Sequence, residues 1–411
     1  MRARLIPVSV MATGKGTVSS RIKGGYGKGR PSRLTSYYRP VVFWNITYKC
    51  NLRCIHCYIN ASPAGLPGEL GDGQLYRIAG EVAEAGLPLV VFTGGEPLAR
   101  RAFWSISEAL SRSLKSRGLP RLALSTNGTL ITGEVADRLR ELGFSYVGVS
   151  IDSTDPVEHD RFRGARGAFE AALRGVMNSM EAGLDVGIRM TLTRQNIVRA
   201  VEVVELARKL GVPRVSLYIL DSIGRAAELR SLFPTREQLR SLADQLIKAS
   251  IDNGGDPEVL VVRGNFLGIY VADKLSKTRR DFLEYLEMLG SQGDCGRKTI
   301  SIYPDGTVKP CQFIEYISLG DLKRESLKKV LSPGNEKLKP FINIDRMLRG
   351  PKCSKCPFKP VCGGGSRNRA LVFSGDLWGD DPLCPIDPTK IAEKWNVSDR
   401  DVAAVIGRDA G

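Results

Sequence analysis

The sequence lacks any apolar run long enough to cross a membrane, although 42% of its 411 residues are hydrophobic. A membrane-spanning helix needs about 20 consecutive apolar residues, whereas the stretch LIPVSVMA near the start is short and is interrupted by Pro7. That stretch also lacks the small-residue cleavage site that ends a secretory signal peptide. We therefore predict a cytoplasmic protein with no membrane partner.

Acidic residues are absent from the first 39 positions, which hold nine lysines and arginines together with many glycines. A segment of this composition cannot bury enough apolar surface to fold. We predict a basic disordered tail over residues 1–39, which contributes to the formal net charge of +16. A loose contact between this tail and nucleic acid or an acidic partner is the alternative.

A fourth cysteine is missing from the first cysteine cluster, which consists of Cys50, Cys54 and Cys57. A structural zinc ion or a complete four-iron, four-sulfur cluster takes four protein ligands. Three thiolates can hold such a cluster and leave one iron free to bind a small molecule. A zinc ion with a distant fourth ligand, or coincidence, are the alternatives. The nine cysteines form clusters in a long chain, which indicates metal sites in a reducing compartment rather than a disulfide framework.

Short apolar runs alternate with amphipathic helical patterns between Val41 and Leu220. The predicted strands are 41–47, 88–94, 121–125, 146–152, 186–192 and 214–220, and the predicted helices between them are 73–86, 102–116, 133–143, 167–183 and 197–211. Six such alternations indicate an all-parallel sheet with outer helices. The pattern leaves open whether the sheet is open, a partial barrel or a full barrel, although about 180 residues are few for a complete eight-fold barrel.

The regular alternation of predicted strands and helices ends after Leu220. Helices are predicted over 235–250 and 277–289, and TISIYPDGTVKPC predicts a hairpin that turns on Asp305–Gly306. The stretch from Pro351 to Pro385 is rich in Gly, Pro and Cys, and such a unit usually needs a metal centre for stability. The predicted divisions are a tail over 1–39, an α/β core over 40–225, a helical connecting region over 226–292, a Cys-rich domain over 293–390 and a C-terminal tail over 391–411.

Polar motifs follow the predicted strands, at the edge where parallel sheets bind ligands. In TGGEP, Gly94 and Gly95 allow the backbone to approach a ligand closely, and Glu96 can accept a hydrogen bond from an ammonium group. Hydroxyl, amide and carboxylate groups after the next two strands suit ribose and carboxylate recognition, with helix capping as the alternative; they are Ser125, Asn127, Ser150 and Asp152. Arg189, in the fifth strand, can face a carboxylate or form a salt bridge.

The first cysteine cluster resembles the signature of the radical S-adenosylmethionine (SAM) superfamily, Cys-x3-Cys-x-aromatic-Cys, with His56 in the aromatic position. The resemblance implies a partial (β/α)6 barrel in which SAM chelates the free iron. One electron then cleaves SAM to a 5′-deoxyadenosyl radical, and the electron donor is a protein such as ferredoxin or flavodoxin. The implied SAM-binding residues are His56, Gly94, Gly95, Glu96, Ser125, Asn127, Ser150, Asp152 and Arg189.

The second cysteine cluster, Cys353-x2-Cys356-x5-Cys362 followed by Cys384, has metal-ligand spacing, with zinc as the alternative. Together with Cys295, Gly306 and Cys311 it resembles a SPASM domain, the C-terminal iron–sulfur extension of many radical SAM enzymes. The resemblance implies an auxiliary 4Fe-4S cluster on Cys353, Cys356, Cys362 and Cys384. The pattern has a further cysteine where this sequence has Ser366. Cys295 and Cys311 are therefore incomplete ligands of a first auxiliary cluster, or relics that pack near the hairpin.

Longer phrases such as LSTNGTLI and SGDLWGDDPLC resemble the branch of the family that modifies tetrapyrrole side chains, which includes the didecarboxysiroheme deacetylase and its relative in haem d1 synthesis. The resemblance covers most of the chain and implies removal of a carboxylate-bearing side chain from an iron tetrapyrrole in haem biosynthesis. Several arginines could bind its carboxylates, with a solvated basic face as the alternative: Arg161, Arg163, Arg166, Arg225, Arg367 and Arg369. For His159 we predict a capping or hydrogen-bonding role.

Two other functions stay open. A SPASM enzyme that modifies a ribosomally made peptide needs an element that recognises a leader peptide, and residues 1–39 show no helix or strand pattern for one. A non-enzymatic, cluster-stapled nucleic-acid-binding protein would explain the charge, but it leaves TGGEP and the open cluster unexplained. We therefore expect an anionic small-molecule substrate and no nucleic-acid partner.

Overall fold

The parallel sheet is the main feature of the computed structural model, which describes residues 5–15, 39–291 and 293–407. Seven of its strands run parallel and neighbour one another in chain order. They are β2 (Val41–Asn45), β3 (Leu89–Thr93), β4 (Arg121–Thr126), β5 (Phe144–Ser150), β6 (Val186–Leu192), β7 (Arg214–Ile219) and β8 (Glu258–Val262). The prediction of an α/β fold with a parallel sheet is confirmed.

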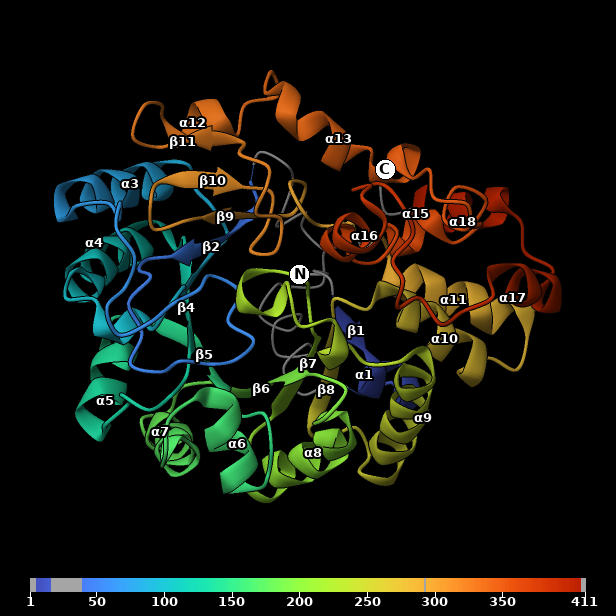
Figure 1. The fold of residues 1–411 in the computed structure, drawn as a ribbon, viewed down its shortest axis with the longest axis horizontal. Helices are drawn as coiled ribbons and strands as arrows, with labels where there is room; N and C mark the ends of the chain where they lie inside the picture. Colours follow the sequence, from blue (N-terminus) through green and yellow to red (C-terminus); the bar gives the residue numbers. More distant parts are fainter. Residues whose placement is uncertain (1–4, 16–38, 292, 408–411) are drawn as a thin grey trace.

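Helices follow the strands and lie on the outer side of the curved sheet (Figure 1). Their inner faces are apolar at helical spacing, as in α3, which buries Leu75, Ile78 and Val82 against a sheet whose Trp44 and Phe92 are fully buried. The helices are α3 (Asp72–Glu84), α4 (Ala102–Arg117), α5 (Gly133–Glu141), α6 (Pro156–Arg163), α7 (Ala168–Glu181), α8 (Ala200–Lys209) and α9 (Arg236–Asp252). None of the helices in the described ranges is long and apolar enough to cross a membrane.

The region 226–292 is not purely helical, so that prediction is wrong in one respect. Between α9 and the helices α10 (Asn265–Leu275) and α11 (Arg279–Leu289), the chain forms β8, which pairs in parallel with β7. All five residues of β8 are buried. A buried apolar run of this length cannot be assigned to a strand or a helix by periodicity alone, and its contact with β7 decides the assignment.

Residues 5–13 are ordered, so the predicted disordered tail is wrong for this part of the chain. Strand β1 (Leu5–Pro7) pairs antiparallel with β8, and helix α1 (Val8–Thr13) follows at once. Ile6, Val8 and Met11 are buried, and β1 covers the hydrogen-bonding edge that β8 would otherwise expose. Residues 1–4 and 16–38 of the predicted tail lie outside the described residues.

The C-terminal part extends the same sheet beyond β2. Strand β9 (Thr299–Ile302) runs parallel to β2, and β10 (Thr307–Lys309) and β11 (Gly320–Asp321) follow antiparallel. The predicted hairpin at Asp305–Gly306 is confirmed by the pairing of β9 with β10. Buried Asn45 joins the two parts, because its side-chain amide donates to the Ser301 hydroxyl at 2.7 Å.

Short helices follow in the C-terminal domain: α12 (Leu327–Val330), α13 (Lys339–Ile342), α14 (Ile344–Met347), α15 (Lys359–Cys362) and α16 (Arg367–Ser374). Two further helices, α17 (Pro388–Trp395) and α18 (Asp399–Gly407), replace most of the predicted C-terminal tail. The Trp395 ring stacks on Phe282 of α11 with 5.4 Å between centroids, and Val402 of α18 is fully buried. This packing on α11 orders the segment, and local sequence does not reveal it.

Candidate active site

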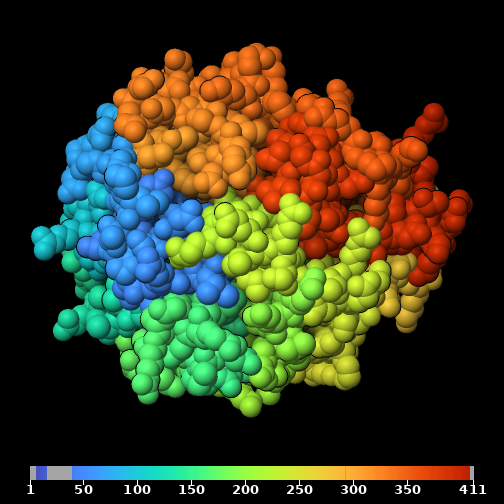
Figure 2. Space-filling model, viewed as in Figure 1, coloured from blue at the N-terminus to red at the C-terminus, as the bar shows by residue number. Residues whose placement is uncertain are grey.

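A cavity lies at the carboxyl ends of the parallel strands, with an empty volume of about 1020 Å³ that includes solvent at its mouth. The loop after β2, the ends of β3 to β7 and the segment after Cys311 line this cavity. In Figure 2 the blue loop after β2 meets the yellow-green segment after β7 on the viewed face. The structure therefore has a cavity at the strand ends where the site was predicted.

The loop with Cys50, Cys54 and Cys57 carries three unbonded thiols that face the cavity. Arg225 holds the loop in place, because its guanidinium donates to the carbonyls of Cys54 at 2.7 Å and Ala61 at 2.9 Å. Burial raises the pKa of the Cys50 thiol to about 12, and a bound iron cluster would favour the thiolate. Three thiols around open space fit a four-iron cluster with one free iron, which agrees with the predicted ligand set.

The TGGEP turn packs directly against the cysteine loop. Gly95 donates its backbone N–H to the Thr47 carbonyl at 2.7 Å, and Glu96 donates to the Lys49 carbonyl at 2.9 Å. A Cβ atom at Gly95 would lie 2.2 Å from the Lys49 oxygen, and one at Gly94, where φ is +122°, would lie 2.8 Å from the Thr47 oxygen. Both positions require glycine, and both backbones line the cavity.

Glu96 lies behind the cavity wall and is fully buried. Its carboxylate accepts hydrogen bonds from the Thr126 hydroxyl at 2.8 Å, the Asn127 N–H at 2.9 Å and the Leu98 N–H at 3.2 Å. Burial raises the pKa of this carboxyl to about 7, against the opposing effect of these donors. Glu96 thus ties the end of β3 to the end of β4, and its predicted contact with an ammonium group stays a prediction.

The polar residues after β4 and β5 divide into two groups. Ser125, Asn127 and Ser150 line the cavity, and the Asn127 amide lies 3.8 Å from the Cys50 sulfur. Asp152 is instead buried behind the wall, where it forms an ion pair with Arg163 and accepts the Thr191 N–H at 2.8 Å. Arg163 in turn lies 3.7 Å from the Cys54 sulfur. The first group can touch a ligand, and Asp152 positions Arg163 beside the cysteine loop.

Two histidines support the site without carrying charge. His56 lines the cavity and stacks on Phe162 with 4.3 Å between ring centroids. Burial lowers the pKa of His56 well below its usual value. His159 accepts a hydrogen bond at Nδ1 from the Asp152 backbone N–H at 3.2 Å, and burial lowers its pKa to about 3. The hydrogen-bonding role predicted for His159 is therefore the one that the structure shows.

Four of the arginines considered as carboxylate ligands do not reach the cavity. Arg161 and Arg166 are exposed on and after α6, whereas Arg367 and Arg369 are buried in the C-terminal domain. Arg369 pairs with Asp381 at 2.7 Å and donates to the Leu220 carbonyl at 3.0 Å. It therefore joins the C-terminal domain to the barrel, and the prediction that it binds a substrate carboxylate is not supported.

Several cavity residues were missed by the sequence analysis, among them Tyr58, Asp221, Gln312 and Phe313. The Tyr58 hydroxyl donates to the Asn45 side chain at 2.5 Å and accepts from the Gln312 amide at 3.2 Å. Burial raises the pKa of Tyr58 to about 12. The positions of Tyr58 and Gln312 directly after Cys57 and Cys311 are the only sequence signal that singled them out.

The C-terminal thiols Cys353, Cys356, Cys362 and Cys384 are unbonded and line one space with an empty volume of about 360 Å³, which includes solvent at its mouth. Within the described parts of the chain, no three Cys, His, Asp or Glu side chains lie close enough together to hold a single metal ion. A four-iron cluster, which is larger than one ion, fits this wider ring of thiols. The ligand set predicted for the auxiliary cluster therefore fits the cavity.

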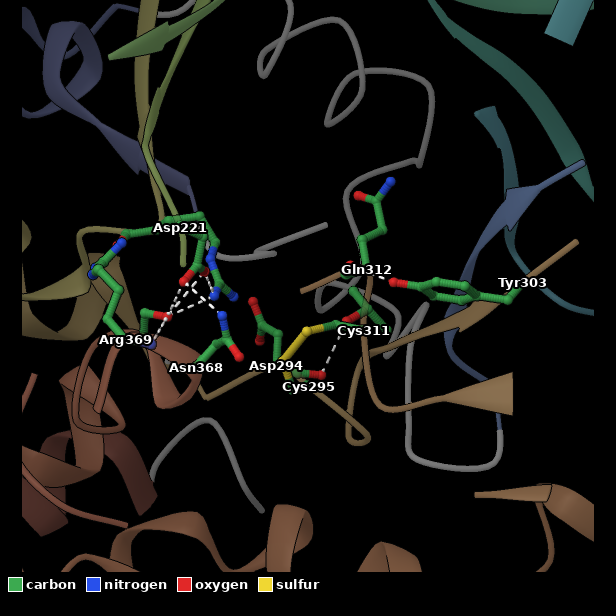
Figure 3. Close-up of a disulfide and its surroundings, with 11 residues drawn as sticks. Asp221, Asp294, Cys295, Tyr303, Cys311, Gln312, Asn368 and Arg369 are labelled. Atoms are coloured by element: carbon green, nitrogen blue, oxygen red, sulfur yellow. Dashed lines mark hydrogen bonds and ion pairs between the residues drawn. A yellow bond between two sulfur atoms is a disulfide. The ribbon is translucent and has the colours of Figure 1, made fainter. Parts of the chain in front are cut away.

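Cys295 and Cys311 form a disulfide with 5.1 Å between their Cα atoms. Sulfurs joined to each other are not thiolate ligands, so this pair does not fit the predicted first auxiliary cluster, and the chain does contain a disulfide. The alternative prediction of packing near the hairpin agrees with their burial beside β9 and β10. Figure 3 shows the disulfide between Tyr303 on one side and Asp221 and Asn368 on the other.

Ser366, which stands where the SPASM pattern has a cysteine, belongs to a buried polar network. Its hydroxyl donates to Asp221 at 2.9 Å and accepts from the Arg263 guanidinium at 2.7 Å. Arg263 also forms an ion pair with Asp221. A hydroxyl engaged by a carboxylate and a guanidinium is not available to iron, which is a second reason why the first auxiliary cluster does not fit.

Comparison with known proteins assigns both parts of the chain. Residues 44–207 match the family model described as the radical SAM superfamily, and residues 294–357 match the SPASM model, an iron–sulfur cluster-binding domain. The Fe-coproporphyrin III synthase of Methanosarcina barkeri is 33% identical over 92% of this chain and 96% of its own length. The pre-heme d1 synthase of Dinoroseobacter shibae is 32% identical over 90% of this chain and 92% of its own.

Solved structures show the same fold. SuiB of Streptococcus suis bound to SAM superposes with a TM-score of 0.64 at 15% identity, over 84% of this chain and 77% of its own. A complex described as anSMEcpe with bound AdoMet and a peptide gives a TM-score of 0.63 at 19% identity, over 89% of this chain and 99% of its own.

The cofactors follow from the two domains. A radical SAM domain works with SAM and a 4Fe-4S cluster, and a SPASM domain holds auxiliary iron–sulfur chemistry. The predicted family, its cofactors and its similarity to the tetrapyrrole branch are thereby confirmed. The chain belongs to the radical SAM superfamily, as an enzyme with a SPASM-type C-terminal domain and with relatives that make haem-type tetrapyrroles.

Proposed function

We propose that this enzyme uses the SAM-derived radical to remove a carboxylate-bearing side chain from an iron tetrapyrrole. The observation that carries the proposal is a single cavity with the three-thiol loop on one wall and aromatic, apolar and cationic side chains on another. Similarity along nine-tenths of the chain to relatives named for haem-type products supports the same substrate class. Apolar walls suit a flat ring, and arginines suit its carboxylates.

In this proposal, Cys50, Cys54 and Cys57 would hold the cluster, which would supply the one electron that splits SAM into methionine and a 5′-deoxyadenosyl radical. The backbones of Gly94 and Gly95 and the side chains of Ser125, Asn127 and Ser150 hold SAM, because all of them line the cavity beside the thiols. Glu96 and Asp152 stabilise this wall from behind through their buried hydrogen bonds and ion pair.

The walls farther from the TGGEP turn receive the substrate. Tyr218, Leu220, Ile223 and Phe313 supply apolar surface there. Neutral His56 can pack against a ligand without drawing a proton from it, since burial keeps its pKa low. Ferredoxin or flavodoxin as the cellular reductant stays a prediction.

The test is a reaction under anaerobic conditions with reconstituted enzyme, SAM, dithionite and iron tetrapyrroles that carry acetate and propionate groups. We expect 5′-deoxyadenosine and a tetrapyrrole lighter by the mass of one carboxylate-bearing side chain, both detected by mass spectrometry. Cys54→Ala should form neither product. Formation of 5′-deoxyadenosine with every tetrapyrrole unchanged would contradict the proposal.

A peptide-modifying activity is the second candidate. The mycofactocin maturase MftC of Mycolicibacterium smegmatis is 30% identical over 83% of this chain and 81% of its own length. A mass change in a short peptide, together with no saturable binding of any tetrapyrrole, would favour this candidate.

A further inference from the structure

Some charged side chains that line the active-site cavity have an oppositely charged partner and others do not. Three arginines line it, Arg163, Arg189 and Arg225, together with one carboxylate, Asp221. A cation in a partly desolvated site is costly unless an anion accompanies it. An anionic ligand would therefore gain most binding free energy at a cavity arginine that has no anionic partner in the protein.

Two of these arginines already have partners. Arg163 pairs with buried Asp152. Arg225 directs its Nε and Nη1 groups to the Cys54 and Ala61 carbonyls and so holds the cysteine loop in place. Among the described residues it has no carboxylate partner, and its buried Nη2 makes no hydrogen bond. The carboxylate is also compensated, because Asp221 pairs with Arg263 and accepts from the Ser366 hydroxyl at 2.9 Å.

Arg189 differs from the other two. It lies in β6 opposite Ser150 of β5, and its guanidinium carbon sits 4.6 Å from the centroid of the Tyr218 ring. Among the described residues no carboxylate lies within ion-pair distance of it, and its cation–π contact with Tyr218 supplies no counter-ion. Among the described residues, Arg189 is thus the cavity guanidinium that has an aromatic support, no counter-ion and no role in holding the cysteine loop.

We propose that Arg189 binds a carboxylate of the substrate and that Tyr218 holds its guanidinium in place. This assignment rests on the proposed function and replaces the predicted contact between Arg189 and SAM. Arg163 is the cationic side chain beside the cysteine loop, 3.7 Å from the Cys54 sulfur. Arg189 lies on β6, three strands away from β3 and its TGGEP turn. Three strand spacings are about 14 Å. A methionine moiety at the cluster is therefore nearer to Arg163.

The neighbours of Arg189 suit the rest of such a substrate. Tyr218 and Phe313 line the same cavity, and Phe313 lies beneath the Arg263 guanidinium with 4.5 Å to its ring centroid. Arg263, at φ +68° directly after β8, thereby holds both Asp221 and Phe313. A carboxylate on Arg189 would leave the attached apolar ring in contact with these aromatic side chains.

Direct binding tests this inference. Coproporphyrin III is titrated into the anaerobically reconstituted holoenzyme and followed by its fluorescence, and SAM binding is measured by equilibrium dialysis. Arg189→Gln should weaken porphyrin binding roughly tenfold to a hundredfold and leave SAM binding within about twofold. Arg161→Gln, at an exposed arginine outside the cavity, should change neither. Arg189→Lys keeps the charge and should fall between wild type and Arg189→Gln.

Coproporphyrin tetramethyl ester separates a charge effect from a general disturbance. Wild type and Arg189→Gln should bind the ester with equal dissociation constants, because the ester cannot form an ion pair with a guanidinium. An equal difference in affinity for acid and ester, an unchanged affinity for the acid, or a loss confined to SAM would each overturn the inference. If the wild-type enzyme binds no porphyrin acid at all, the proposed function fails first. If it binds and Arg189→Gln binds equally well, only the assignment of Arg189 fails.

Discussion

Polar residues that follow neighbouring strands have different roles once the chain is folded. Ser125 and Asn127 reach the cavity, whereas Glu96 and Asp152, which also follow strands, turn into the protein and find donors there. The physical reason is that a buried carboxylate needs several donors or a counter-ion. Thr126, Asn127 and Arg163, which themselves line the cavity, supply these donors to the two buried carboxylates.

The neutral state of His159 makes stability depend on pH. Its pKa falls from 6.5 to about 3 on burial, so below pH 6.5 the unfolded chain takes up a proton that the folded protein excludes. The stability associated with neutral His159 is present above pH 6.5 and is lost as the pH falls toward 3. Between pH 7.5 and 5 this loss is about 2 kcal/mol.

His159→Gln keeps a hydrogen-bond acceptor and should remove this loss. Urea unfolding of reconstituted wild type and variant at pH 7.5 and pH 5 measures the difference between the two proteins. Glu96, whose pKa is raised to about 7, adds stability as the pH falls. It does so equally in both proteins and cancels from the comparison. An equal drop in stability for both would show that His159 does not titrate as described.

At the scale of elements, the four C-terminal thiols around α15 and the Cys295–Cys311 disulfide predict different iron contents. Wild-type enzyme should hold about eight irons in two four-iron clusters. Cys362→Ala should hold about four, because one ligand of the C-terminal ring is lost. The double variant Cys295→Ser, Cys311→Ser should stay at about eight. Iron and sulfide analysis measures all three, and a loss of iron in the double variant would show that these cysteines are ligands.

Strand β1 should be a stabilising element, because Ile6 is fully buried opposite Val261 of β8. Ile6→Ala should lower the free energy of unfolding by about 2–5 kcal/mol. Val157→Ala, at a side chain that is 74% exposed, should change it by no more than about 0.5 kcal/mol. Denaturant unfolding compares the two, and equal effects would mean that β1 does not pack on β8 in solution.

At the scale of the whole molecule, buried hydrogen bonds from Arg369 and Ser366 hold the C-terminal domain on the barrel. Arg369 of α16 pairs with Asp381 and reaches the carbonyls of Leu220 and Arg263 at the ends of β7 and β8. Arg369→Met should lower the free energy of unfolding by about 3–5 kcal/mol, because Asp381 would remain buried without its partner.

Arg349→Met is the matched control for Arg369→Met. Arg349 pairs with Asp376 at 2.8 Å but is 67% exposed, so its loss should cost less than about 1 kcal/mol. Thermal unfolding with hydrogen exchange at the ends of β7 and β8 measures both variants. Equal protection of these strand ends in the two variants would contradict the joining role of Arg369.

Local pattern determined the six parallel strands from β2 to β7, the helices between them except α6, the hairpin at Asp305–Gly306, and the cysteine sets that face the two cavities. Such features depend on residue type and spacing within short windows, so the local sequence is enough to predict them. Only the tertiary structure decided that β1 and β8 join the sheet, that α17 and α18 pack on α11, and that Cys295 bonds to Cys311. It alone also separated Arg189, which has no carboxylate partner among the described residues, from Arg163 and Arg369, which have one. The reason is physical: whether a short apolar run is a strand, or a charge is compensated, depends on partners that lie far away in sequence.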